Sequence, residues 1–184
     1  RLQVGETVVV IGAGGLGLHA IQLARLADAA RIVAVDQSEA ARDAALEAGA
    51  DEALDPTVDE EPARALRRAA RGATLVLECV GRSETVELGL GALAPGGRLV
   101  VVGVGTDRPR LPPLGMFIGA ELSVHGSFGS TTDEIRTVLD LIVSGRLDVS
   151  RSVRRQVPIT KAADVFTEPL GPGRTVVIPK EQIP

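Results

Sequence analysis

The sequence TVVVIGAGGLG at positions 7–17 decides the fold of this chain, together with RIVAVD at positions 31–36. The first stretch begins with β-branched residues, which are typical of a parallel strand buried on both faces. It then turns through glycines into a helical run, and the second stretch reads as another strand that ends in Asp36. This order of strand, glycine turn, helix, strand and acid predicts a dinucleotide-binding unit.

Three glycines in the first stretch have separate tasks in such a turn. Gly12 makes the tight turn, Gly14 lets the backbone approach a pyrophosphate, and Gly17 lets the helix pack close to the strand. The N–H groups at the helix N-terminus suit a phosphate. A glycine turn that serves packing alone would leave the acid at position 36 unexplained, so the pattern favours a cofactor site.

Asp36 indicates which dinucleotide binds. A carboxylate at the end of the second strand accepts hydrogen bonds from both hydroxyls of the adenosine ribose and repels a 2′-phosphate. The residues that follow it, Gln37 and Ser38, are not basic. We therefore predict NAD rather than NADP as the cofactor. Arg42, on the following helix, is interpreted as a solvated surface charge.

The composition describes a folded chain with few groups suited to chemistry. Hydrophobic residues make up 45% of its 184 residues and aromatic residues only 2%, which predicts an aliphatic core. A single cysteine excludes an internal disulfide and suits a reducing compartment, so we expect a cytoplasmic protein. The net charge of −4 and the lack of membrane-length apolar runs argue against nucleic-acid and membrane partners.

Strand and helix patterns alternate through most of the chain. They predict an α/β fold with a doubly wound, parallel, six-stranded Rossmann sheet in the order 3-2-1-4-5-6, and a ligand site between strands one and four. Strands are expected at residues 8–11, 31–35, 52–54, 74–78, 98–104 and 121–126, with a turn at 95–97. Helices are expected at residues 16–27, 38–46, 60–71, 83–93 and 134–144, with N-caps at Ser38, Ser83 and Thr132. Residues 107–116 contain three prolines and are expected to be extended.

The pattern changes near the C-terminus, which divides the chain into two expected parts. Residues 1–147 are predicted to form an NAD-binding Rossmann domain. Residues 148–184 contain a strand at 152–157, a short helix at 160–166 and a last strand at 174–178, which do not continue the alternation. This tail is expected to return to another part of a larger structure.

Few side chains are candidates for catalysis. Cys79 ends the fourth strand and faces the predicted site, but neither His19 nor His125 has a sequence reason to reach it as a base. We interpret Cys79 as a small core residue. One cysteine and two histidines on separate elements do not make a zinc site, which needs at least three placed ligands. The sequence therefore assigns no catalytic residue and no metal ligand.

Several stretches of the sequence together form a specific pattern. They are residues 10–24, 34–36, 48–51, 78–81, 95–103 and 121–127. Together they resemble the nucleotide-binding half of zinc-dependent medium-chain alcohol dehydrogenases. The resemblance is to the secondary-alcohol, threonine and sorbitol dehydrogenase side of that family, and it covers nearly the whole chain. It implies hydride transfer between an alcohol and NAD.

The resemblance also implies cofactor-binding roles for individual residues. The implied contacts are Gly14, Gly15, Leu16 and Arg174 with the pyrophosphate, Asp36 with the ribose, Val80 and Arg82 with the adenosine side, Val102 and Val104 with the nicotinamide, and the backbone of Ser127 and Gly129 with its carboxamide. One position departs from the family pattern. The basic residue that contacts the ribose in the family falls on Ala41 here, and Arg42 comes one residue later.

The resemblance implies a second lobe that this sequence does not contain. In the family, that lobe carries the catalytic zinc, the proton relay and most of the substrate pocket. Zinc is therefore expected only there, and the tail is interpreted as the remnant of the segment that returns to it. We predict an NAD-dependent alcohol dehydrogenase by family, whose present chain binds NAD(H) but turns over alcohols negligibly. A small alcohol or carbonyl substrate would bind only together with the catalytic lobe.

Two alternative functions and one assembly are also considered. The first alternative is a stand-alone dinucleotide-binding or regulatory module without catalysis, which the adjoining DNA would discriminate. The second is a zinc-independent quinone or enoyl reductase, against which Asp36 argues. The resemblance further implies a homodimer through the sixth strand and residues 111–118, whose apolar side chains suit either an interface or a cover for the core.

Overall fold

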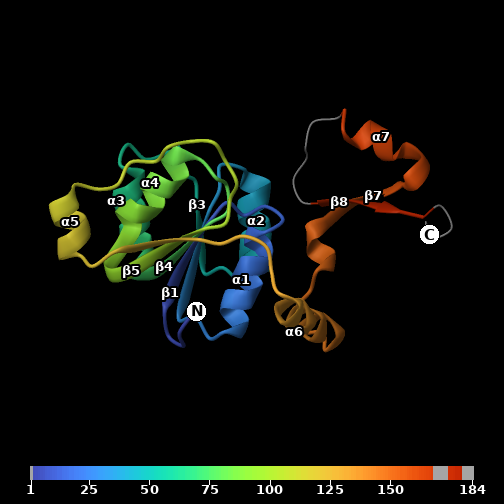
Figure 1. Ribbon diagram of the computed structural model, residues 1–184, viewed down its shortest axis with the longest axis horizontal. Coiled ribbons are helices and arrows are strands. Elements are labelled where there is room, and N and C mark those ends of the chain that lie inside the picture. The colour runs from blue at the N-terminus through green and yellow to red at the C-terminus, as the bar shows by residue number, and fades with distance from the viewer. Residues whose placement is uncertain (1, 168–173, 180–184) are drawn as a thin grey trace.

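A six-stranded parallel sheet forms the centre of the computed structural model, which describes residues 2–167 and 174–179. The strands are β1 (Thr7–Ile11), β2 (Arg31–Val35), β3 (Glu52–Leu54), β4 (Ala73–Glu78), β5 (Leu93–Val101) and β6 (Ser123–Gly126). They lie in the order β3-β2-β1-β4-β5-β6, which confirms the predicted order (Figure 1). The two halves of the sheet therefore meet between β1 and β4, which pair directly.

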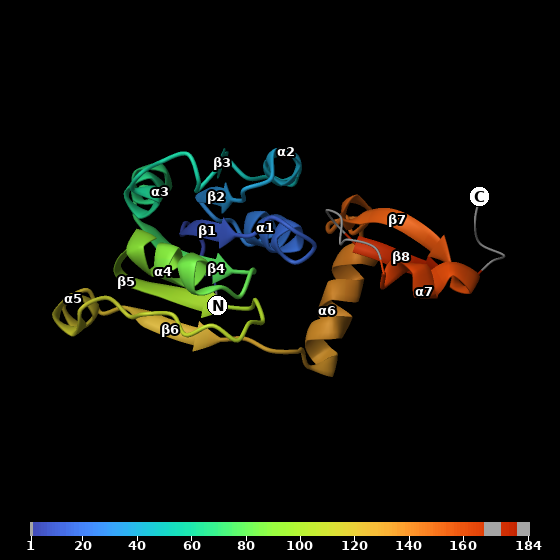
Figure 2. The same cartoon turned by 90° about the horizontal axis from the view of Figure 1, so that it is seen from above.

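Four helices cover the two faces of the sheet. They are α1 (Gly17–Leu26) and α2 (Glu39–Glu47) on one face, and α3 (Pro62–Ala70) and α4 (Ser83–Ala92) on the other (Figure 2). Side chains alternate along β1, so Val8 packs with α1 and α2 while Val9 packs with α3 and α4. β1 is buried on both faces, as its run of β-branched residues predicted.

The fifth strand differs from the expected one at both ends. At its start, the turn expected at residues 95–97 is part of the strand, where the register with β4 shifts. At its end, the N–H groups of Val102 and Gly103 both donate to the carbonyl of Glu78, at 2.8 and 3.0 Å. The predicted continuation over 98–104 was wrong beyond residue 101, because these two bonds turn the backbone out of the ladder.

A short helix, α5 (Leu114–Gly119), replaces the last part of the segment expected to be extended over 107–116. The chain is irregular up to Pro113. The carbonyl of Pro113 then accepts hydrogen bonds from the N–H groups of Met116 and Phe117, at 2.8 and 3.0 Å. The prediction failed here because a proline just before a helix lacks only an N–H that the first turn does not use.

The starts of three helices test the predicted caps. At α2 the expected cap is confirmed, because Ser38 Oγ accepts an N–H from the first turn at 3.4 Å. At α6 (Thr132–Val143) the cap is Thr131, whose N–H donates to the Glu134 carboxylate at 2.7 Å, and not the next residue as predicted. At α4 the cap is Arg82, so Ser83 is already the first helical residue.

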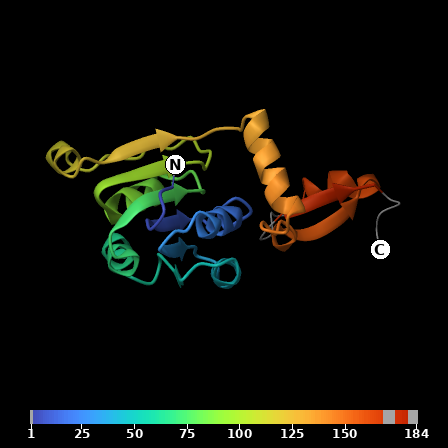
Figure 3. The same cartoon turned by 90° about the horizontal axis from the view of Figure 1, so that it is seen from below.

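The chain after α6 forms a small separate sheet. It consists of β7 (Val153–Pro158) and β8 (Arg174–Ile178), which pair in parallel, with the 3-10 turns Ser150–Ser152 and Ile159–Lys161 and the helix α7 (Ala162–Val165). These elements lie close to the expected ones at 152–157, 160–166 and 174–178. Figure 3 shows this unit beyond α6, apart from the six-stranded sheet. We call residues 148–167 and 174–179 the tail.

Two side-chain contacts join the tail to α1. Gln22 Nε2 donates to the carbonyl of Asp148, and the N–H of Asp148 donates back to Gln22 Oε1, both at 3.0 Å. One turn away, His19 Nε2 and Ser152 Oγ are also 3.0 Å apart.

Each of the 12 residues of α6 is at least partly exposed. In the described part of the chain, none of the helices has both the length and the apolar character that a membrane crossing needs.

Candidate functional site

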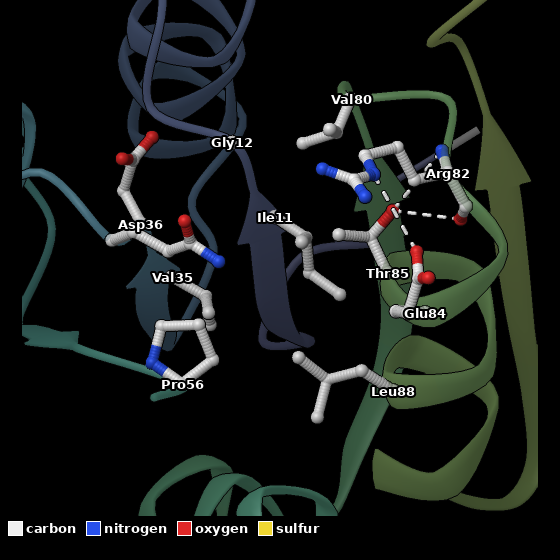
Figure 4. Close-up of a pocket in the computed structure, with 11 residues that line it drawn as sticks. Ile11, Gly12, Val35, Asp36, Pro56, Val80, Arg82, Glu84, Thr85 and Leu88 are labelled. Atoms are coloured by element: carbon white, nitrogen blue, oxygen red, sulfur yellow. Dashed lines mark hydrogen bonds and ion pairs between the residues drawn. The ribbon is translucent and has the colours of Figure 1, made fainter. Parts of the chain in front are cut away.

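A cavity of about 350 Å³ opens at the carboxyl ends of β1, β2 and β4 (Figure 4). The two halves of the sheet meet here, which is where open α/β sheets bind ligands. Its middle is apolar, because Ile11 and Leu88 face each other across it. The lining residues are Ile11, Gly12, Val35, Asp36, Gln37, Pro56, Val80, Arg82, Glu84, Thr85 and Leu88.

The glycine turn borders this cavity and is as tight as its spacing predicted. Gly12 has a φ of 89°, and its N–H donates to the carbonyl of Val35 at 2.8 Å. A Cβ on Gly17 would lie 1.8 Å from the Gly12 carbonyl oxygen, whereas a Cβ on Gly14 would meet nothing within 4 Å. No side chain caps the start of α1. The N–H of Leu18 donates to the carbonyl of Gly14 at 3.0 Å, and no side chain competes with an anion for the other N–H groups of the first turn.

Asp36 joins the end of β2 to the glycine turn. Its Oδ2 accepts a hydrogen bond from the N–H of Ala13, and its Oδ1 accepts one from the N–H of Ser38, both at 2.9 Å. The carboxylate is thus oriented before any ligand arrives, and each oxygen keeps a further lone pair for an acceptor role. The sequence predicted the acid but not its bond to Ala13.

Arg42 is not the solvated charge that the sequence suggested. Its side chain is only 20% exposed, and Nη1 lies 3.0 Å from Asp55 Oδ2. The same nitrogen donates to the carbonyls of Asp36 and Gln37, at 2.9 and 2.8 Å. The interpretation was wrong because Arg42 pairs with Asp55. Asp55 follows β3 and lies beside α2 only in the folded chain, so helix periodicity alone cannot reveal this partner.

Glu78 holds the opposite wall of the cavity. This side chain is fully buried, and its Oε1 accepts hydrogen bonds from the N–H groups of Val80 and Gly81 and from the Thr85 hydroxyl, each at 2.8 Å. Its Oε2 finds no partner among the described residues. Sequence reasoning missed the role of Glu78, although a lone acid at the end of the apolar strand β4 was a usable signal.

Val80 and Arg82 follow Glu78 and line the cavity opposite Asp36 (Figure 4). Val102 and Val104 lie outside the cavity, in the loop after β5. The loop after β4, which contains Gly81, is in close contact with the loop after β5, because a Cβ on Gly81 would lie 2.7 Å from the backbone of Val104. The structure thus brings Val80 and Arg82 into the cavity and the two valines next to it.

The remaining predicted residues come from β6 and from the tail. Ser127 lies beside the end of β5, since its N–H donates to the Val101 carbonyl at 2.9 Å. Gly129 follows in an exposed loop with a φ of 69°. Arg174 begins β8, and its side chain lies over Gly15, where a Cβ would be 2.8 Å from Nε. The tail therefore delivers a cation to the glycine turn.

The cysteine and the histidines are not arranged for catalysis. Burial and the neighbouring Glu78 charge raise the pKa of Cys79 to about 11, so this thiol stays protonated near neutral pH. It packs with the α1 and α2 face rather than lining the cavity, which corrects the expected orientation. Burial and nearby Arg174 lower the pKa of His19, which faces Ser152. His125 is exposed on β6.

A metal site is not formed by residues 2–167 and 174–179, where no three His, Cys, Asp or Glu side chains are placed to hold an ion. The described residues therefore do not fit a catalytic zinc. A dinucleotide fits better, because the cavity combines an apolar slot with an oriented carboxylate, and the glycine turn at its border leads to a helix N-terminus without a side-chain cap.

Comparison with known sequences places this geometry in a family. The sequence pattern of the zinc-binding dehydrogenases matches residues 15–144. Probable D-xylulose reductase A of Arthroderma otae is 32% identical over 169 residues, which cover 89% of this chain and 47% of the relative. Sorbitol dehydrogenase of Mus musculus is 29% identical over 190 aligned positions, covering all of this chain and 53% of the relative. The chain spans about half the length of the curated relatives it matches.

Solved structures agree with the sequence comparison. A zinc-binding dehydrogenase of Sinorhizobium meliloti, bound to NADP, superposes with a TM-score of 0.87 at 29% identity, over 96% of this chain and 53% of the other. Alcohol dehydrogenase TADH of Thermus sp. ATN1 gives a TM-score of 0.81 at 33% identity, over 90% and 48%. The matched region is the NAD(P)-binding part of these oxidoreductases. The chain belongs to the zinc-binding dehydrogenase family.

Proposed function

We propose that this chain binds NAD(H), in preference to NADP(H), as the cofactor-binding part of a zinc-dependent alcohol dehydrogenase. The observation that carries the proposal is the oriented Asp36 carboxylate at the rim of the cavity. A fixed carboxylate accepts both ribose hydroxyls and repels a 2′-phosphate. Because one structural relative is bound to NADP, the preference needs a direct test.

The proposed contacts follow the path of an extended dinucleotide. The apolar slot between Pro56 and Leu88 would hold the adenine, and the N-terminus of α1, which no side chain caps, the pyrophosphate. The proposed ligand residues are Gly12, Gly14, Gly15, Leu16 and Gly17 of the glycine turn, Asp36 at the ribose, Val80 and Arg82 at the adenosine, Val102 and Val104 at the nicotinamide, Ser127 and Gly129 at the carboxamide, and Arg174 at the pyrophosphate. The position of Arg174 over Gly15 supports the last of these roles.

The chemistry divides between the cofactor and the chain. NAD, when bound, supplies the hydride transfer, and this chain binds and orients it. Among the described residues, no three His, Cys, Asp or Glu side chains are placed to hold a metal ion, so we assign these residues no role in binding a substrate-activating metal. The named relatives reduce xylulose or oxidise sorbitol, and we propose a secondary alcohol of the polyol class for the complete enzyme.

Calorimetric titration of the 184-residue chain with NADH and NADPH tests the proposed cofactor. We expect NADH to bind more tightly, and Asp36→Asn to weaken NADH binding by roughly 10- to 100-fold, the range of a lost charged hydrogen bond. Asp43→Asn, an exposed carboxylate on α2, is the matched control and should leave NADH affinity within about twofold. Equal affinity for both cofactors in the wild type would overturn the proposed preference.

The same chain should turn over alcohols negligibly, because substrate activation is assigned to a lobe outside these residues. A spectrophotometric assay with NAD and sorbitol, xylitol or 2-propanol checks this. Ordinary turnover would contradict the division of labour. NADH binding without turnover, and with no zinc lobe encoded nearby, would instead favour the stand-alone binding module.

We also propose a homodimer formed along β6, the edge strand of the sheet, and the adjacent α5. The exposed apolar side chains of Leu111, Leu114, Met116 and Ile118 support this surface. Sedimentation velocity should show a dimer for the wild type and a monomer for Met116→Glu. Val58→Glu, at an exposed apolar residue elsewhere, is the control and should remain dimeric.

The free thiol of Cys79 agrees with the proposed cytoplasmic location.

A further inference from the structure

A second carboxylate, Asp55, pairs with Arg42, a cation that contacts the backbone of Asp36. Its Oδ2 lies 3.0 Å from Arg42 Nη1, and its Oδ1 accepts hydrogen bonds from the N–H and the hydroxyl of Thr57, at 2.9 and 2.6 Å. Both oxygens are therefore engaged. The Thr57 bonds hold Oδ1, and Oδ2 meets the guanidinium of Arg42.

Arg42 is held by backbone oxygens as well. Its Nη1 donates to the carbonyls of Asp36 and Gln37, the two residues that lead from β2 toward α2. With Asp55, three oxygens surround this one nitrogen, and both side chains of the ion pair are about four-fifths buried. The guanidinium therefore lies against the backbone of the residue whose carboxylate is proposed to meet the ribose.

The neighbouring charges are arranged in a definite order. The Asp36 carboxylate faces the glycine turn through its bond to Ala13, while Arg42 lies behind the Asp36 backbone on Asp55. Arg82 lies on the opposite wall of the cavity (Figure 4). A guanidinium is well suited to a phosphate, because its planar fork can bond two oxygens at once. The cation that could serve a 2′-phosphate is therefore present, but it is engaged elsewhere.

We propose that Asp55 is a specificity-determining residue that retains Arg42 away from the ribose 2′ position. Asp36 repels the 2′-phosphate directly, and Asp55 withholds the cation that would otherwise compensate for a loss of Asp36. The inference rests on the proposed NAD(H) site and deepens it. It implies that replacing Asp36 alone does not produce a chain that binds NADPH well.

The test compares Asp36→Ser, Asp55→Asn and the double variant in the 184-residue chain, by calorimetric titration with NADH and NADPH. Asp55→Asn is chosen because its remaining oxygen can still accept the Thr57 bonds, while its amide N–H₂ faces the Arg42 donors and releases them. We expect the double variant to bind NADPH about tenfold more tightly than Asp36→Ser does. This gain should shrink as salt is raised, because it comes from a cation and a phosphate.

Two controls assign the gain to Arg42. Adding Arg42→Ala to the double variant should abolish it, and Asp36→Ser/Asp43→Asn, which removes the same charge next to Arg42, should not produce it. An Asp36→Ser chain that binds NADPH as tightly as the double variant would overturn the inference, as would a gain that survives Arg42→Ala. If the folded wild type binds neither cofactor, the proposed function itself fails. If it binds NADH but the double variant gains nothing, only the role of Asp55 is refuted.

Discussion

Gly14 and Gly17 lie three residues apart and yet answer to different constraints. A methyl group on Gly17 would stand 1.8 Å from the carbonyl oxygen of Gly12, inside the contact between α1 and β1, whereas a methyl group on Gly14 would meet no atom within 4 Å. One glycine serves the fold, and the other leaves space for a ligand.

Alanine at each position should separate these two roles. Gly17→Ala should destabilise the chain by about 3 kcal/mol or prevent folding, because the turn must open to admit the methyl group. Gly14→Ala should stay within about 1 kcal/mol of the wild type but bind NADH at least about tenfold more weakly, since the backbone can no longer approach the pyrophosphate. Urea unfolding and NADH titration measure the two effects. A Gly17→Ala chain of unchanged stability would show that the turn relaxes.

Glu78 is a buried carboxylate that accepts hydrogen bonds from the loop after β4 and so stabilises that loop. Glu78→Leu should cost about 2 to 4 kcal/mol, because it leaves the N–H groups of Val80 and Gly81 without their acceptor. Glu78→Gln should cost less, since it keeps one acceptor oxygen. Glu84→Leu, at an exposed position in the first turn of α4, is the control for replacing a glutamate by leucine outside the core. If the leucine and glutamine variants unfold at the same urea concentration, the loop does not depend on this acceptor.

At the scale of elements, an ion pair joins the start of β1 to β5. Glu6, just before β1, meets Arg98 of β5 through two contacts of 2.7 Å, and the hydroxyl of Thr74 on β4 donates to the same carboxylate at 2.8 Å. The Arg98 hydrogen bonds lower the pKa of Glu6 from 4.5 to about 2. The stabilisation that follows is present above pH 4.5 and is lost as the pH falls toward 2.

Acid unfolding should therefore depend on Glu6. The shift corresponds to an upper bound of about 3 kcal/mol, of which more than half should be lost by pH 3. Urea midpoints of the wild type and Glu6→Gln should differ most near pH 7 and converge toward pH 2. Glu60→Gln, an exposed acid before α3, should follow the wild type. A constant difference between wild type and Glu6→Gln across this range would mean that the pair contributes nothing through charge.

For the whole molecule, the tail makes two kinds of contact with the rest of the chain, one with α1 and one with the glycine turn. The bonds from Asp148 to Gln22 and from Ser152 to His19 are partly exposed, so their loss should cost the sheet little. Arg174, however, comes from the tail to the glycine turn. The tail is therefore expected to matter more for the cofactor than for folding.

A chain that ends at residue 147 tests this asymmetry. It should melt within about 5 °C of the full chain, because a loss of one or two kcal/mol moves the melting temperature only slightly in a protein of this size. Its NADH affinity should fall about tenfold, and Arg174→Ala in the full chain should reproduce that fall. An unfolded truncated chain would refute the proposed domain of residues 1–147, and unchanged affinity would remove Arg174 from the proposed site.

Local pattern alone was sufficient for the sheet and for the glycine turn. Strand order, the turn from Gly12 to Gly17 and the acid at position 36 follow from periodicity, burial and the short range of the βαβ unit. The errors were also local, at Pro113, at Thr131 and beyond residue 101, where one or two hydrogen bonds of backbone groups decide whether an element begins or ends.

Only the tertiary structure decided which side chains meet around the cavity. Arg42 is paired with Asp55 because β3 returns beside α2, and Glu78 faces its loop because β4 ends beside α4. Arg174 reaches Gly15 from the far end of the chain. Such contacts depend on distances between elements rather than on spacing within one, so the sequence by itself determined the kind of site and the folded chain determined its partners.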